Sequence, residues 1–240
     1  MAVRNRPLTG KASRDGRKVI AQAQSSRRSG WLWLAAGVVV AAPIVAIVVI
    51  SIVKSPATRA PETESASLQK PPATVAVGAD TMPPWPAPAD AKAAVAAAGL
   101  PMLGSEGAVE HIHAHLDVLL DGKPVPVPRD VGIDTDTRRG TISPLHTHDE
   151  TGVIHVESPV KRQFSLGEFF SEWQVSLSAD NIGALRAGGG KLVRVVVNGT
   201  PQTGNPAAIT LGPHDEVAVV YGTPQPGETL PSKYDFGEGE

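Results

Sequence analysis

The chain has 240 residues, a formal net charge of −2 and no cysteine, which excludes disulfides, thiolate metal sites and cysteine nucleophiles. One apolar run near the N-terminus raises the hydrophobic content to 41%, so the folded part is smaller than the length suggests. Without cysteine, a bound metal must accept nitrogen and oxygen ligands. The chain also has only three methionines, which disfavours copper(I).

The first 53 residues have the pattern of a membrane anchor. Residues 1–30 hold eight Lys or Arg and one acid, and we interpret them as a basic, disordered tail rather than a nucleic-acid-binding arm. Residues 31–53, from Trp31 to Val53, carry no charge and are long enough to cross a lipid bilayer as a helix. The positive-inside rule places the tail in the cytoplasm and the chain from residue 54 onward outside. A cleaved signal peptide is the alternative, but its apolar region is normally shorter.

A spacer is expected between the membrane and the folded domain. Residues 54–104 are rich in Pro and Ala, which favours a semi-extended linker. Within this linker, residues 90–98 are alanine-rich and predict a short helix that Asp90 caps and Gly99 ends.

Two hairpins are predicted at the start of the folded domain, which is expected to span residues 105–222. Residues 110–120 alternate as a half-buried strand does, and an Asp-Gly turn signal separates them from a return strand over residues 123–127. The prolines of that return strand lack an amide donor, so we expect it at a sheet edge. Residues 142–148 and 153–157 predict two further strands around a turn.

The clearest helix signal outside the apolar run covers residues 164–173. Ser165 and Glu168 have the spacing of a capping box. The apolar side chains of this segment fall on one helical face, and they are Leu166, Phe169, Phe170 and Trp173. An aromatic stripe at this spacing is more often core than a ligand site, so the segment predicts the core helix of the domain.

Strands return after the helix. Residues 191–197 and 215–221 predict two strands, and residues 209–211 a third, short one. The predicted fold class is therefore α+β, with antiparallel hairpins packed on one helix. Residues 223–240 are acidic and rich in Pro and Gly, which is typical of a disordered tail.

The second half of the domain resembles a known fold. Residues 195–199 read Val-Val-Val-Asn-Gly, and residues 211–220 read Leu-Gly-Pro-His-Asp-Glu-Val-Ala-Val-Val. These segments resemble the end of a β-grasp domain of the ubiquitin and sulfur-carrier type. The resemblance implies a β-grasp-like fold and no activity.

Histidines are concentrated on the two predicted hairpins. Six of the seven lie between residues 111 and 155, and they are His111, His113, His115, His146, His148 and His155. Side chains at i and i+2 of a strand project the same way, about 7 Å apart, so imidazoles can converge on one ion. Neutral imidazole suits zinc, copper and nickel. The alternative interpretation is a polar strand face that bonds to carboxylates or titrates near neutral pH.

The histidine segments also resemble those of other proteins. The motifs are Glu-His-Ile-His-Ala-His-Leu-Asp at 110–117, Leu-His-Thr-His-Asp at 145–149, Gly-Val-Ile-His-Val-Glu at 152–157 and Phe-Ser-Leu-Gly-Glu-Phe-Phe at 164–170. Together they are similar to those of a group of single-pass, membrane-anchored proteins of actinobacteria and archaea. The resemblance covers residues 105–235 and implies that both histidine segments and the aromatic helix belong to one domain type.

Three functions fit these patterns. The first is a membrane-anchored, extracytoplasmic module that binds zinc, copper(II) or nickel and buffers it or delivers it to a protein partner. The second is a zinc-dependent hydrolase or lyase, in which three histidines hold the metal and Glu157 or Asp149 acts as base. The third is a module without metal that meets a protein partner in a pH-dependent way. The absence of a nucleophile motif, a phosphate loop and a nucleotide fingerprint favours the first.

Overall fold

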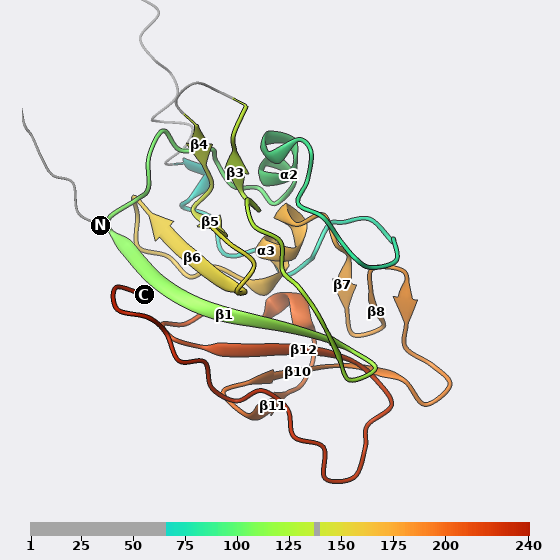
Figure 1. Cartoon of the computed structure of the whole chain (residues 1–240). Helices are drawn as coiled ribbons and strands as arrows, with labels where there is room; N and C mark the ends of the chain where they lie inside the picture. The colour runs from blue at the N-terminus through green and yellow to red at the C-terminus, as the bar shows by residue number, and fades with distance from the viewer. Residues whose placement is uncertain (1–65, 137–139) are drawn as a thin grey trace, which may run out of the picture. The chain divides into compact units, whose positions relative to one another are not determined.

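The structure is a computed structural model that describes residues 66–136 and 140–240 (Figure 1). The expected basic tail, the apolar run at 31–53 and the first part of the expected spacer lie outside these residues. Within the described ranges, no helix is both long and apolar enough to span a bilayer.

A mixed seven-stranded sheet forms the centre of the described region. Its strands follow the order β11-β10-β12-β1-β6-β5, and β2 pairs with β1 off this path. The bounds are β1 Glu110–Leu120, β2 Lys123–Val125, β5 Leu145–His146, β6 Val153–Ser158, β10 Leu192–Val197, β11 Thr200–Gln202 and β12 Glu216–Gly222. The central pair, β1 and β12, is parallel, and the other pairs are antiparallel. Strands that are distant in sequence thus meet at the centre of the sheet.

The two-residue turns follow their sequence signals. Asp121 and Gly122 join β1 to β2 with φ of 49° and 76°, and Asn198 and Gly199 join β10 to β11 with φ of 50° and 76°. Positive φ at both central residues matches the right-handed twist of a hairpin, which is why Asn-Gly and Asp-Gly pairs favour it. The predicted hairpin over residues 110–127 is confirmed, and the Asn-Gly turn signal at 198–199 leads into a return strand, β11, that was not predicted.

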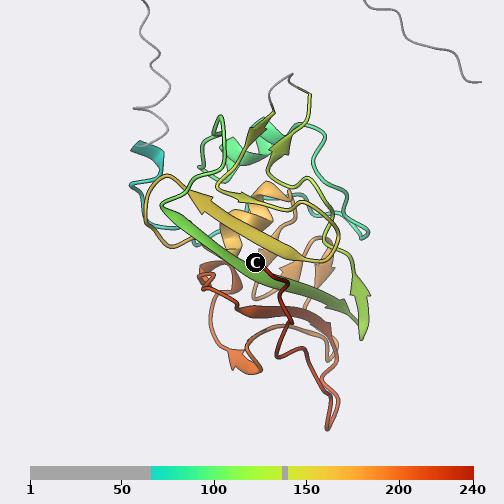
Figure 2. The ribbon, with the colours of Figure 1, turned by 60° about the vertical axis from the view of Figure 1, so that its left-hand side comes forward.

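The predicted core helix is α3, Leu166–Glu172, which packs on one face of the sheet (Figures 1 and 2). The Ser165 side chain accepts from the Glu168 amide and the Glu168 carboxylate accepts from the Ser165 amide, so the predicted capping box is present. Phe169, Phe170 and Trp173 are at most 1% exposed and join the inward side chains of the sheet in one core. The aromatic stripe is core, as its spacing predicted.

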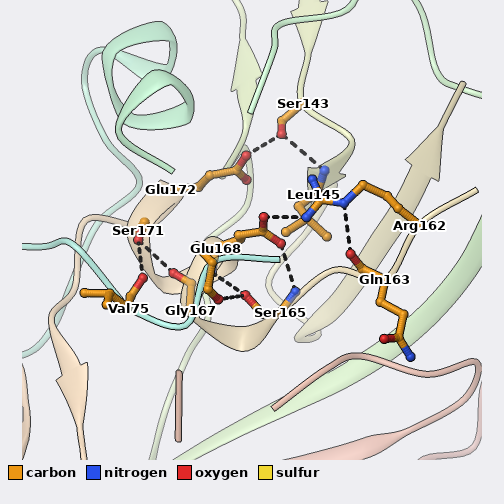
Figure 3. A network of polar contacts seen from close by, with 11 residues as sticks. Val75, Ser143, Leu145, Arg162, Gln163, Ser165, Gly167, Glu168, Ser171 and Glu172 are labelled. Carbon is orange, nitrogen blue, oxygen red and sulfur yellow. Dashed lines mark hydrogen bonds and ion pairs between the residues drawn. The ribbon is translucent and has the colours of Figure 1, made fainter. Parts of the chain in front are cut away.

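All residues of α3 are buried, including the polar ones. The polar side chains of the helix therefore need hydrogen-bond partners inside the protein. Figure 3 shows Ser171 bonded to the carbonyls of Val75 and Gly167, and Glu172 bonded to the Ser143 hydroxyl. The carboxylate of Glu168 also pairs with a neighbouring guanidinium. The Glu172 bond links the helix to the loop that precedes β5, and the Ser171 bond to Val75 links it to the N-terminal part of the described region.

Residues 66–104, expected to form part of a spacer, contribute to the same core. Leu68, Trp85 and Val95 are buried, and the Trp173 indole donates to the Trp85 carbonyl at 3.1 Å. The predicted short helix is α2, Ala91–Ala97, with Asp90 as its N-cap. Proline-rich composition indicated an extended chain, but Leu68, Trp85 and Val95 cover the core, while Val75, Val77 and Met82 face solvent.

Two short segments differ from their predicted strands. Residues 142–148 do not form one strand, because β4 (Thr141–Ile142) pairs with β3 (Ile133–Asp134) and β5 pairs with β6. Pro144, which has no amide donor, lies between β4 and β5 where the partner changes. Residues 209–211 form only an isolated bridge from Thr210 to Ser165. A small sheet of β7 (Leu177–Ser178), β8 (Asn181–Ile182) and β9 (Leu185–Arg186) and the 3-10 helix η1 (Pro206–Ala208) complete the region.

The C-terminal segment lies against the face of the sheet that is opposite α3. Residues 228–236 contain no helix or strand, yet Leu230 packs on Val196, Ala218 and Val220. Figure 2 shows the end of the chain in front of β1 and β6. The acidic tail, expected to be disordered, therefore covers part of the outer face.

Candidate metal centre

The outer face of β1, β6 and β5 carries a row of histidines. The strand register pairs His113 with His155 and His155 with His146. The ring centroids are 4.5 Å apart in the first pair and 5.2 Å apart in the second. Alternation along each strand sends the neighbouring residues into the core, so packing of the apolar side chains holds the histidines on the other face. Three strands thus bring together side chains from two distant segments.

His146, His148 and His155 form the first group that could hold a metal ion. One nitrogen from each ring lies within 4.8 Å of the others. His148 lies two residues beyond the end of β5. Its ring centroid is 4.8 Å from that of His146 and 4.5 Å from that of His155. His146 is fully buried, His155 is half-buried and His148 is exposed. The group is therefore anchored at one end and faces solvent at the other.

The hydrogen bond of His146 fixes its tautomer. Its Nδ1 lies 2.9 Å from the carbonyl oxygen of Ser143, and because a carbonyl only accepts, Nδ1 carries the proton. Nε2 then bears a free lone pair, and it is buried without a hydrogen-bond partner in the described residues. Nδ1 of His155 is likewise buried without a hydrogen-bond partner among these residues. Buried polar atoms are seldom left unpaired, and coordination of a cation would satisfy both of these nitrogens.

A second group lies beside the first. It contains His111, His113 and Glu157, again with ligand atoms within 4.8 Å of one another. His111 Nε2 is 3.4 Å from Glu157 Oε1, and Glu157 Oε2 is buried without a partner among the described residues. Glu106, on the loop before β1, approaches from solvent, with its Oε1 4.0 Å from His148 Nε2. The site combines imidazole nitrogens with carboxylate oxygens, a ligand set that suits borderline divalent metals.

Burial keeps the inner histidines neutral. It lowers the pKa of His146 to about 3 and that of His155 to about 4, and neighbouring histidines act in the same direction. Burial lowers the pKa of His113 as well, while it raises the pKa of Glu157. A neutral imidazole offers its lone pair to a metal without first losing a proton. His146 and His155 therefore do not titrate near neutral pH, which disfavours the interpretation of this row as a pH-sensitive face.

His115, expected as a ligand beside His111 and His113, lies apart from them. Its Nε2 is 2.7 Å from the Thr151 carbonyl oxygen, and its Nδ1 is 2.6 Å from Glu216 Oε2. Its ring stacks on Tyr234 at 3.8 Å between centroids. Burial, the largest single effect, lowers the pKa of His115, but the hydrogen bond and charge of Glu216, together with the Thr151 carbonyl and Asp117, outweigh it and raise the pKa. Both nitrogens are occupied, so the structure does not bring His115 into the row.

His115 nevertheless belongs to a separate cluster with Asp117 and Glu216, whose ligand atoms also lie within 4.8 Å of one another. Because its short hydrogen bonds already satisfy the imidazole, this cluster needs no ion to explain its geometry. The histidine on the loop before β12, His214, is exposed with φ of 57° and stays outside every group.

Sequence reasoning missed three residues that shape the site. Glu106 lies in an irregular loop with no periodicity to mark it. Glu216 meets His115 only through the parallel register of β1 and β12. Ser143 acts through its backbone carbonyl, which every residue has. No sequence signal could have identified the last two, whereas Glu157 was found because it follows His155 in phase.

Comparison with protein-family models, with curated proteins and with solved structures finds no match for this chain. Its function is therefore inferred from the geometry of the site.

Proposed function

We propose that this protein is a membrane-anchored, extracytoplasmic module that binds a divalent transition metal and buffers it or delivers it to a protein partner. The observation that carries the proposal is the convergence of His146, His148 and His155, two of which have buried nitrogens with no hydrogen-bond partner in the part of the chain that the structure describes. Zinc, copper(II) and nickel match the imidazole ligands, and no cysteine competes for them.

The exposure of part of the site supports transfer rather than permanent storage. His148 lies outside the strand ladder and is exposed, and the His111 side chain is 54% exposed. Structural zinc sites, by contrast, are closed by four protein ligands. A partner protein could therefore reach the ion from the side of His148 and Glu106.

Membrane anchoring and a β-grasp-like arrangement complete the proposal. The uncharged run at 31–53 and the basic residues before it support a single-pass anchor with a cytoplasmic N-terminus. The parallel pairing of β1 with β12 at the centre, with a helix on one face, supports the likeness to β-grasp domains. The domain would then project from the outer surface of the membrane.

Calorimetric titration of the full chain in detergent micelles with zinc, copper(II) and nickel tests the metal function. We expect binding in the micromolar range or tighter, and a loss of more than about 10-fold in affinity in His148→Ala, because even ligand-supporting residues change affinity by that much. His214→Ala removes an exposed histidine outside the site and should bind as the wild type does. Failure of all three metals to bind below millimolar concentration would refute the function.

A further inference from the structure

The histidine row offers more ligands than one ion can use. Five imidazoles and one buried carboxylate lie on this patch, and zinc takes four ligands in most protein sites. The ligands divide into two groups of three that share no residue: His146, His148 and His155 in the first, and His111, His113 and Glu157 in the second. Each group converges separately to within 4.8 Å. The geometry thus provides two centres of coordination.

The two centres are in direct contact. The rings of His113 and His155, one from each group, have centroids 4.5 Å apart. The groups are therefore neighbours on adjacent strands, as in sites where two metal ions lie about 3.5–4 Å apart.

Glu157 lies between the groups. Its Oε1 is 3.4 Å from His111 Nε2 in the second group and 3.6 Å from His155 Nδ1 in the first. The same oxygen thus faces ligands of both groups, and Oε2 is buried without a hydrogen-bond partner among the described residues, which leaves it free for a metal ion. Glu157 also forms a third overlapping group with Glu106 and His146. A bridging carboxylate would offset part of the repulsion between two dications.

We propose that the site binds two divalent transition-metal ions side by side, with Glu157 shared between them. This inference rests on the proposed metal-binding function and extends it from one ion to a pair. The first group fills first, because two of its nitrogens are buried and have no hydrogen-bond partner within residues 66–136 and 140–240, whereas His111 of the second group is exposed. The second ion binds more weakly, because it enters next to a positive charge.

The test counts ions on the full chain in detergent micelles by native mass spectrometry with zinc. Two ions are expected on the wild type and on His214→Ala, and one ion on His111→Ala, whose substituted side chain is exposed and outside the core. His148→Ala should lose the tighter step and retain one ion. Glu157→Gln, which keeps the shape of the side chain, should lose the second ion while far-ultraviolet circular dichroism stays unchanged.

Electron paramagnetic resonance with copper(II) provides a second measurement. We expect an isolated signal at one equivalent and dipolar broadening at two equivalents, and the broadening should be absent in His111→Ala. A single ion on the wild type, or two ions that His111→Ala leaves unchanged, would overturn the paired site and leave the proposed function intact. No bound ion at all would overturn both.

Discussion

His146 is fully buried, and a hydrogen bond to the loop before β5 holds its ring. The Ser143 carbonyl oxygen accepts from its Nδ1, and the Ser143 hydroxyl in turn donates to Oε1 of Glu172. A fully buried acid on α3 is therefore connected, through one serine, to the innermost histidine of the site (Figure 3). Groups that orient a ligand in this way influence metal affinity almost as much as the ligands themselves.

The burial of Glu172 leads to a prediction about stability and pH. Burial raises the pKa of Glu172 well above its usual value of 4.5, so the folded protein binds a proton that the unfolded chain releases. This contribution to stability is complete below about pH 4.5 and is lost as the pH rises through the folded-state pKa. Glu172→Gln should therefore remove a decline in stability that the wild type shows as the pH rises above about 4.5.

Urea unfolding at several pH values measures this effect. Glu150→Gln, which changes an exposed acid in the turn before β6, is the matched control and should keep the decline of the wild type. If Glu172→Gln kept the same slope, Glu172 would be ionised in the folded state.

At the scale of elements, the tight approach of β6 to β1 depends on one glycine. Gly152, just before β6, has φ of 95°, and a Cβ there would lie 2.6 Å from the Leu116 carbonyl oxygen and 3.0 Å from His115 Nε2. The Leu116 amide also donates to the Gly152 carbonyl at 2.9 Å. A side chain at this position would push apart the two strands that align the histidines.

Gly152→Ala is therefore expected to destabilise the fold through both backbone strain and a steric clash. Left-handed backbone alone costs an L residue about 1–2 kcal/mol. Gly99→Ala is a suitable control, because Gly99 has φ of 77° and nothing within 4 Å of its virtual Cβ. We expect Gly152→Ala to lower the free energy of unfolding by more than Gly99→Ala does. Equal losses would mean that the strands move apart without cost.

At the scale of the whole molecule, the fold begins well before the first histidine. Leu68, Trp85 and Val95 are at most 4% exposed and share the core with α3. Full burial of each aliphatic side chain is worth about 1.5–3 kcal/mol, and removal of a buried Trp costs about 3–5 kcal/mol. The summed contribution of these three side chains is comparable to the total stability of a typical domain, about 5–15 kcal/mol.

A chain that starts at residue 105 should therefore fail to fold, whereas one that starts at residue 66 should fold cooperatively. Thermal melts followed by near-ultraviolet circular dichroism compare the two, since Trp173 reports on the core that both chains contain. Equal melting temperatures would show that residues 66–104 cover the core without stabilising it.

Local patterns in the sequence determined much of this protein. Alternation placed His111 and His113 on the face opposite the core, the Ser165 and Glu168 pair marked the start of α3, and the Asp-Gly and Asn-Gly pairs marked two turns. These features depend on residues within a few positions of one another, where backbone geometry and side-chain spacing are sufficient.

Only the tertiary structure decided which histidines meet. The strand register placed His155 between His113 and His146. The parallel pairing of β1 with β12 brought the Glu216 carboxylate to His115, which therefore does not join the row. The burial of residues 66–104 was likewise decided by the core that they cover. The physical reason is the same in each case: these contacts join segments far apart in the chain, and the free energy of packing the whole core selects them.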